Sequence, residues 1–472
     1  MTSQSYPITP TQPLPAKPSL EQLKKQAKDL LKAVKAGDAS ACPVLRLHVR
    51  FADSPDEAIL GADLSLQEVQ HVVALQYGFK DWNALRDAVP ARDSKAASER
   101  EMLTAIIAAA IAQDASDIHI EPSSERVRVR FRIDGVLHEQ DPMPTELGGR
   151  VTRDAMQWAG LDLDKAMPQD GRFTTSNAGR DMRVHVSAME SLHGPVLTMR
   201  CLITGDVPRL NDVGFEPETL RVFREKLNLP RGMIIVTGPS GCGKSTTIYG
   251  ALAELNTAER KIVTVEDPIE YLIDGIDQTQ IRPEQGVDFS RALRSAIRQD
   301  ADVIMAGEIR NADMAHVLIQ SVLTGRLVLT TLHTEDAPGA LIRLLDMGIP
   351  PFLVKDSVRC VLAQRLVRRV CENCKEEYTP PDNELKEAGL PAGTVLYRGK
   401  GCDKCHGHGF RGRTAIHSLL DVTDAMQDAV MTGDAIRITE AARSAGCDSL
   451  RAAAIRKAVA GITTLEEALR VT

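Results

Sequence analysis

The sequence predicts an α/β protein with a doubly wound, mostly parallel sheet in its C-terminal part, preceded by an upstream α+β domain and a small helical N-terminal module. Three observations predict this. From residue 206 to residue 472, short apolar strands alternate with helical segments, which is typical of a parallel sheet covered on both faces. Residues 100–205 contain a helix and then short alternating strands with Gly and Asn turns, which favours an antiparallel sheet. Residues 20–89 repeat apolar side chains at steps of three and four, the period of a helix.

The length and composition fit a globular protein of about three domains. The chain has 472 residues, 43% of them hydrophobic and 26% charged, and a net charge of -7. This charge predicts no general attraction to nucleic acid or to an anionic membrane. The five prolines among the first twenty residues favour a flexible tail over residues 1–19. Because the sequence has neither a secretory signal nor an apolar run near the ~20 residues of a spanning helix, we expect a cytosolic protein.

A phosphate-binding loop is the most informative motif. Residues 238–245 read Gly-Pro-Ser-Gly-Cys-Gly-Lys-Ser and fit the pattern G-x-x-x-x-G-K-[ST] between a strand and a helix. The glycines let backbone N–H groups approach phosphate oxygens, and the helix N-terminus adds partial positive charge. We expect Lys244 to contact the β- and γ-phosphates and the Ser245 hydroxyl to ligate Mg²⁺. The predicted nucleotide-binding residues are Gly238, Pro239, Ser240, Gly241, Cys242, Gly243, Lys244, Ser245 and Thr246.

Acidic residues and a histidine follow three further apolar strands. Glu308 follows the strand at 302–306, Glu266 begins the segment Glu-Asp-Pro-Ile-Glu at 266–270, and His333 follows the strand that ends at Leu332. Parallel strands that end together would bring these groups to the phosphate loop. Hydrolysis needs one group to hold Mg²⁺ and another to orient the attacking water. We therefore predict that Lys244, Glu266, Glu308 and His333 are catalytic, although each acid alone could be a solvated loop residue.

Four cysteines have the spacing of a structural zinc site. Cys371 and Cys374 form one C-x-x-C pair, and Cys402 and Cys405 form a second pair after 27 residues. Two such turns supply four thiolates, which fill the tetrahedron around Zn²⁺ and leave no open position. A redox-active pair or an iron–sulfur cluster would use the same residue type. We predict a zinc-binding insert at about residues 370–412.

Five ordered motifs resemble the type II/IV secretion ATPase superfamily. They are TGPSGCGKSTT, VEDPIEY, ADVIMAGEIR, LVLTTLHTED and AQRLVRR, and upstream ASDIHIEP, VRFRIDGVL and PQDGRF are also similar to the family. The resemblance covers about residues 100–472 and implies a RecA-like ATPase domain that binds ATP and Mg²⁺. It also implies arginines of the upstream domain that close onto the phosphates. Arg130 and Arg132 match this role, and Arg183 and Arg200 are further candidates. Ala166-Met167, Pro195 and Ala301 depart from the family pattern, which affects the upstream domain more than the catalytic core.

The resemblance also implies how such a protein works. The family forms homo-hexamers that act on the cytoplasmic side of the inner membrane, through a membrane platform protein, in type IV pilus assembly or type II protein secretion. The four-cysteine insert favours an assembly or secretion motor over a retraction motor. Residues 20–89 do not resemble the usual first N-terminal domain, and we expect them to dock on another protein.

Two other functions use the same residues. A nucleic-acid translocase could combine the ring with a basic patch at Arg365, Arg368 and Arg369, but the acidic net charge and the aromatic content of 4% argue against direct nucleic-acid binding. A nucleotide-binding scaffold or sensor with little hydrolysis is the second alternative. Steady-state phosphate release separates it from a motor.

Overall fold

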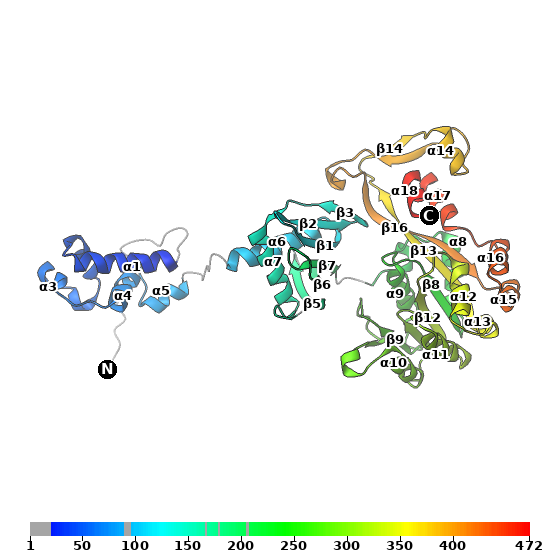
Figure 1. Cartoon of the computed structure of the whole chain (residues 1–472), viewed down its shortest axis with the longest axis horizontal. Helices are drawn as coiled ribbons and strands as arrows, with labels where there is room; N and C mark the ends of the chain where they lie inside the picture. The colour runs from blue at the N-terminus through cyan, green and yellow to red at the C-terminus, as the bar shows by residue number, and fades with distance from the viewer. Residues whose placement is uncertain (1–19, 89–95, 166–167, 178–179, 204–206) are drawn as a thin grey trace.

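The computed structural model describes residues 20–88, 96–165, 168–177, 180–203 and 207–472, and Figure 1 shows these segments in chain order from blue to red. They form a helical module, an antiparallel sheet with two helices, and a larger mixed sheet with helices on both faces. The proline-rich tail expected at residues 1–19 lies outside the described residues.

The helical module has its own apolar core. Leu23, Ala27 and Val34 on one face of the first helix are buried against Val69 and Val73 of the fourth, as the sequence period predicts. The fourth helix begins with a capping box, in which the Ser65 hydroxyl accepts from the N–H of Glu68 and the Glu68 carboxylate accepts from the N–H of Ser65. The helices are α1 (Leu20–Lys35), α2 (Cys42–Leu45), α3 (Asp56–Leu60), α4 (Leu66–Gln76) and α5 (Trp82–Ala88).

The upstream domain is an antiparallel sheet with both helices on one face (Figure 1). Ile118, Ile120 and Phe131 alternate into the core beneath these helices, while Asp117 and His119 point to the opposite face. The strand order is β3-β2-β1-β7-β6-β5, with β4 beside β2. The elements are α6 (Ala96–Ala112), β1 (Ala115–Pro122), β2 (Arg126–Ile133), β3 (Val136–Glu139), β4 (Met143–Pro144), α7 (Thr145–Trp158), β5 (Gln169–Asn177), β6 (Arg180–Met189) and β7 (Val196–Ile203).

The larger sheet is parallel except at one edge. Its order is β10-β9-β11-β12-β8-β13-β16, and only β16 runs antiparallel to its neighbour. The strands are β8 (Gly232–Thr237), β9 (Ile262–Glu266), β10 (Asp277–Gln280), β11 (Val303–Ala306), β12 (Leu327–Leu332), β13 (Val358–Val370) and β16 (Phe410–Asp421). This arrangement confirms the predicted doubly wound α/β fold.

Alternate residues of these strands belong to two separate hydrophobic cores, one on each face of the sheet. Ile234 and Val236 of β8 pack with the helices α8 and α9, whereas Met233 and Ile235 pack with the helices on the other face. Every residue of β8 is buried, because parallel strands covered on both faces have no solvent side. The helices are α8 (Pro217–Leu227), α9 (Lys244–Leu255), α10 (Phe289–Ile297), α11 (Ala312–Leu323), α12 (Ala337–Asp346) and α13 (Pro351–Ser357).

The four-cysteine insert lies between β13 and β16, and helices follow it to the end of the chain. The insert contains β14 (Lys375–Tyr378), α14 (Asp382–Glu387) and β15 (Leu396–Gly399), and the helices are α15 (Asp424–Met431), α16 (Ala435–Ser444), α17 (Leu450–Val459) and α18 (Leu465–Val471). None of the helices among the described residues combines the length and apolar character that crossing a bilayer requires.

The upstream domain contacts the larger α/β unit at two separate places. Near the phosphate loop, the Arg183 guanidinium donates to the Ile269 carbonyl oxygen at 3.0 Å. Beside the insert, Asp134 in the turn between β2 and β3 accepts from the backbone N–H of Gly412 at 2.8 Å. The rings of His138 and His408 pack there with centroids 4.1 Å apart.

Two neighbouring glycines of α7 provide a test of the upstream core. A Cβ at Gly148 would lie 2.3 Å from Val127 Cγ2, whereas a Cβ at Gly149 meets nothing within 4 Å. We expect Gly148→Ala to destabilise the domain by about 1–3 kcal/mol through overpacking. Gly149→Ala should stabilise it by up to ~1 kcal/mol, because alanine favours the helix. Differential scanning calorimetry of the two variants measures the difference, and equal melting temperatures would contradict the packing described.

Candidate functional site

The phosphate loop joins the end of β8 to the start of α9. Gly238, Gly241 and Gly243 have φ angles of 148°, 75° and 87°, which only glycine adopts readily. A Cβ at Gly238 would also lie 2.4 Å from the Gln364 carbonyl oxygen. Gly243 is the N-cap of α9, so the loop ends on the first free N–H groups of a helix, a favourable place for a phosphate group.

Gln364 of β13 supports the loop from below. Its fully buried side-chain amide donates to the Cys242 carbonyl oxygen at 2.8 Å and accepts from the Thr247 hydroxyl at 2.7 Å. One side chain therefore fixes both the loop and the first turn of α9. No local sequence signal marks this role of Gln364, because its partners lie more than 100 residues earlier in the chain.

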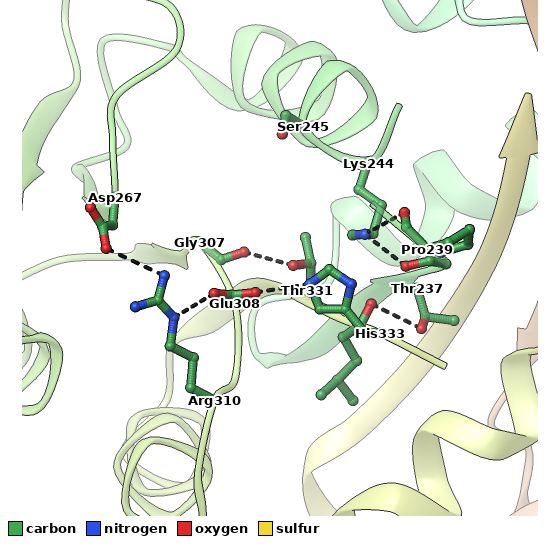
Figure 2. A network of polar contacts seen from close by, with 12 residues as sticks. Thr237, Pro239, Lys244, Ser245, Asp267, Gly307, Glu308, Arg310, Thr331 and His333 are labelled. Atoms are coloured by element: carbon green, nitrogen blue, oxygen red, sulfur yellow. Dashed lines mark hydrogen bonds and ion pairs between the residues drawn. The ribbon is translucent and has the colours of Figure 1, made fainter. Parts of the chain in front are cut away.

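Lys244 is folded back onto its own loop. Its ammonium group donates to the carbonyl oxygens of Gly238 and Pro239 at 2.7 and 2.9 Å (Figure 2). Burial lowers the pKa of Lys244, because a buried ammonium group loses hydration. A phosphate group in the loop would replace the two carbonyl oxygens as its acceptor.

Glu308 lies at the centre of the polar network in Figure 2. Glu308 lies two residues after the end of β11, and His333, directly after β12, contacts its Oε2 through Nε2 at 2.9 Å. On the other side, the Arg310 guanidinium contacts Oε1 of Glu308 and lies 3.3 Å from Asp267. The structure thus brings together Glu308 and His333, which the sequence placed at the ends of separate strands, and adds Arg310.

Glu266 and Glu270 have different surroundings. The Ser245 hydroxyl donates to Glu270 Oε1 at 3.1 Å, so Glu270 is the acid that reaches the predicted Mg²⁺ ligand. Glu266 is 3% exposed and hydrogen-bonds with Tyr249, Thr264 and Gln278. Burial raises the pKa of both carboxyl groups. The catalytic role predicted for Glu266 stays a prediction.

The four candidate arginines differ in the groups that they contact. Arg130 forms two hydrogen bonds with Glu121 at 3.1 and 2.5 Å, and Arg132 donates to the Gly135 carbonyl oxygen at 2.9 Å. Both are therefore engaged within the upstream domain. Arg183 reaches the backbone of Ile269, one residue from Glu270, and the positive charge of Arg200 opposes the rise in the pKa of Glu270 that burial causes.

A cavity of about 240 Å³ connects these groups. It lies between the phosphate loop, the ends of β9 and β11, and His333 after β12. Its polar lining comprises Ser240, Lys244, Ser245, Tyr249, Glu266, Asp267, Glu270, Glu308, Arg310, Thr331 and His333. Such a cavity can hold a phosphate chain between a cation, an N-terminal helix turn and several carboxylates.

The four cysteines of the insert also come together. The sulfur atoms of Cys371, Cys374, Cys402 and Cys405 all lie within 4.8 Å of one another, and three of the distances are 3.7, 3.8 and 3.9 Å. Zinc–sulfur bonds of about 2.3 Å in a tetrahedron give sulfur–sulfur distances of about 3.8 Å. The donor set therefore fits a zinc ion.

Backbone and amide N–H groups surround this cluster. The N–H groups of Cys402 and Gly409 donate to Cys405 Sγ at 3.2 and 3.3 Å, and the Asn373 amide donates to Cys402 Sγ. The Asn373 hydrogen bond lowers the pKa of Cys402 to about 6. The lowered pKa favours the thiolate at Cys402, the form that binds metal, whereas burial raises the pKa of Cys374.

Two arginines of the predicted basic patch near the insert form contacts with other groups of the chain. Arg365 donates to the backbone oxygens of Gln364 and Glu335. Arg368 contacts Glu467 at 2.8 Å and lies over the Phe410 ring. These contacts weaken the argument for a nucleic-acid surface at this place.

The fold and the site together define a P-loop ATPase. Residues 92–470 match the family described as Type II/IV secretion system protein, and the chain belongs to this family. It is therefore an ATPase of the protein secretion and type IV pilus assembly class.

Two curated relatives have known roles. The Type II secretion system ATPase E of Vibrio cholerae is 43% identical over 83% of this chain and 80% of its own length. The Type IV pilus assembly ATPase PilB of Thermus thermophilus is 43% identical over 77% of this chain. The match spans only 42% of that longer relative.

Solved structures support the fold. The ATPase DotB of Legionella pneumophila superimposes with a TM-score of 0.59 at 20% identity, covering 78% of this chain and 95% of DotB. The pilus retraction motor PilT with bound ADP gives a TM-score of 0.53 at 22% identity, with 78% and 96% covered.

Arg310 provides a test of the Glu308 network. Burial alone would raise the pKa of Glu308, but hydrogen bonds from Arg310 and His333 outweigh burial and lower it. We expect Arg310→Ala to raise this pKa, so that ATPase activity is lost at a higher pH as the solution is acidified. The stability that the lowered pKa provides is likewise lost when the pH falls through the folded-state value, and the variant should have less of this stability to lose. The rate of hydrolysis against pH measures the shift.

Arg298→Ala is the control for that measurement, because Arg298 donates to the backbone of its own helix. If Arg310→Ala and Arg298→Ala lose ATPase activity at the same pH on acidification, Arg310 does not control the pKa of Glu308.

Proposed function

We propose that this chain is a homo-hexameric motor that hydrolyses ATP to drive type IV pilus assembly or type II protein secretion, at the cytoplasmic side of the inner membrane. One observation carries the proposal. Lys244, Ser245, Glu270 and Glu308 line a single cavity in a chain that aligns with four-fifths of the type II secretion ATPase of Vibrio cholerae.

The site residues have different roles in hydrolysis. Lys244 leaves the carbonyl oxygens that hold it and contacts the β- and γ-phosphates of ATP. Glu308 orients the attacking water, and His333 holds the Glu308 carboxylate from the far side. A side chain that orients water contributes typically 10²–10⁴-fold to the rate. ATP and water then give ADP and phosphate.

Ser245 and Glu270 are the residues placed to hold Mg²⁺, since the hydroxyl and the carboxylate lie 3.1 Å apart. Bound Mg²⁺ would supply positive charge to the phosphate oxygens during transfer. Arg183 contacts the segment that carries Glu270, and the positive charge of Arg200, which also donates to Asp117, acts on Glu270. Arg130 and Arg132 form contacts within their own domain. A movement of the upstream domain toward the nucleotide would bring Arg183 and Arg200 to the phosphates first.

Exposed apolar side chains support assembly with further copies of the chain. Leu192 is 93% exposed and Leu272 is 73% exposed. Leu272 lies two residues beyond Glu270, so a neighbouring subunit at that surface would lie close to the nucleotide. Isolated exposed apolar residues are common, and the assembly therefore rests mainly on the family.

The partners we propose are an inner-membrane platform protein and a second protein bound by residues 20–88. The helical module has an apolar core of its own, which is the property of a separate domain. The insert, with Cys371, Cys374, Cys402 and Cys405 around Zn²⁺, is the element that we expect at the platform.

Phosphate release tests the motor. Lys244→Ala and Glu308→Gln should each reduce steady-state phosphate release by at least 100-fold, because they remove the phosphate contact and the carboxylate that orients water. Lys386→Ala, an exposed lysine of the insert, should leave the rate unchanged. Measurement over a range of protein concentrations should show activity that rises as the hexamer assembles. Tight ATP binding without release at any concentration would support the scaffold or sensor instead.

Metal content tests the insert. Its own core is small: Leu385, Ala388 and Leu396 are buried together with Leu465 of α18. A structural zinc ion can contribute on the order of 10 kcal/mol to folding such a unit. Cys402→Ser should lose the bound zinc and lower the melting temperature, as measured by atomic absorption and calorimetry. Cys447→Ser, a cysteine outside the cluster, should keep both at the wild-type value.

A further inference from the structure

The segment from Glu266 to Gln278 is held in shape by a buried carboxylate. Glu266 accepts the Tyr249 hydroxyl on Oε2, and on Oε1 it accepts the Thr264 hydroxyl at 2.5 Å and the Gln278 amide at 3.2 Å. Both oxygens are thus engaged, and the side chain is 3% exposed. A carboxylate in this state has little freedom to turn toward a ligand.

The hydroxyl group of Tyr249 has a second contact. It accepts from the backbone N–H of Glu270 at 3.1 Å while it donates to Glu266. Glu270 in turn accepts the Ser245 hydroxyl on its carboxylate. A single hydroxyl therefore joins the buried acid to the acid that faces the phosphate loop.

The helix α9 explains why Tyr249 can do this. Ser245 and Tyr249 are four residues apart and lie on the same face of the helix, one turn from each other. Both contact the segment after β9: Ser245 contacts the Glu270 side chain, and Tyr249 contacts its backbone. The helix that begins at the phosphate loop thus carries the groups that set the distance to Glu270.

Gln278 closes the other end of the segment. Its amide donates to the Tyr271 carbonyl oxygen at 2.9 Å, and its Oε1 accepts from the Ile273 N–H at 2.9 Å. The residues between β9 and β10 form no helix or strand, so these side-chain contacts replace the backbone ladder that would otherwise fix them.

We propose that Glu266 and Tyr249 are a positioning pair: their hydrogen bond fixes the backbone of Glu270 so that its carboxylate faces Ser245, while Glu266 itself contacts neither the nucleotide nor its metal ion. The proposal rests on the proposed ATPase function of this site. It reassigns Glu266 from a catalytic to a positioning residue and adds Tyr249.

The surroundings of the pair agree with this role. Burial raises the pKa of the Tyr249 hydroxyl, so Tyr249 keeps its proton and remains a donor. A buried acid with donors on both oxygens is costly to disturb, which makes it suited to hold a loop and poorly suited to exchange protons with water.

Steady-state hydrolysis by the full-length protein tests the proposal. The variants are Tyr249→Phe, Glu266→Gln, the double variant and Glu270→Gln, with rates measured against ATP concentration and binding of a fluorescent ATP analogue measured separately. Tyr271→Phe is the matched control. The two tyrosine rings are neighbours, with centroids 5.1 Å apart, but the hydrogen bonds described above do not include the Tyr271 hydroxyl.

We expect Tyr249→Phe and Glu266→Gln each to lower kcat about tenfold, with KM and analogue binding within twofold of wild type. The double variant should be no slower than the slower single variant, because both changes weaken the same hydrogen bond: Tyr249→Phe removes its donor, and Glu266→Gln replaces its charged acceptor with a neutral amide. Glu270→Gln should lose at least 100-fold, and Tyr271→Phe should match wild type. Unchanged melting temperatures exclude general unfolding as the cause.

Two results overturn the proposal. If Glu266→Gln is as inactive as Glu270→Gln, Glu266 is itself catalytic. If Tyr249→Phe hydrolyses ATP at the wild-type rate, the hydroxyl positions nothing. A different result is that the wild-type protein shows no ATP hydrolysis, or only hydrolysis that Lys244→Ala leaves unchanged. That result refutes the ATPase function on which the proposal rests.

Discussion

The parallel register of the larger sheet is the constraint on which the site depends. Val265, Ala306, Thr330, Ile235 and Val361 lie in one row across five neighbouring strands. Four of these strands end within two residues of the row, and β13 continues beyond it and carries Gln364. Glu266, Glu308, His333, the start of the phosphate loop and Gln364 follow the row by one to three residues. A shift of one residue in any strand would turn its side chain to the opposite face.

The parts that sequence predicts well are those whose geometry is local. The phosphate loop binds through its own backbone, so eight consecutive residues contain nearly all the information that it needs. Each C-x-x-C turn likewise specifies two ligands, and the structure brings the two turns together. Glu308 and His333 were predictable because a parallel sheet aligns strand ends, and their contact at 2.9 Å is the outcome.

The parts that sequence could not predict depend on distant partners. Nothing in the sequence around Gln364 indicates that its amide holds residues more than 100 positions away. In the sequence Tyr249 is an ordinary helix residue, and its hydrogen bond with Glu266 of β9 is visible only in the fold. The arginines illustrate a further difficulty. Arg130 and Arg183 are both charged residues in antiparallel strands, and only the strand order shows that one faces Glu121 while the other reaches Ile269.

The two places where the upstream domain contacts the α/β unit have a geometric consequence. One is the contact between Arg183 and Ile269 beside the nucleotide cavity, and the other is the contact between Asp134 and Gly412 beside the cysteine cluster. Rotation about the line that joins these two places leaves both contacts in position, whereas other movements separate at least one of them. While both contacts hold, the upstream domain can therefore rotate about one axis, and the position of that axis is set by the two contacts.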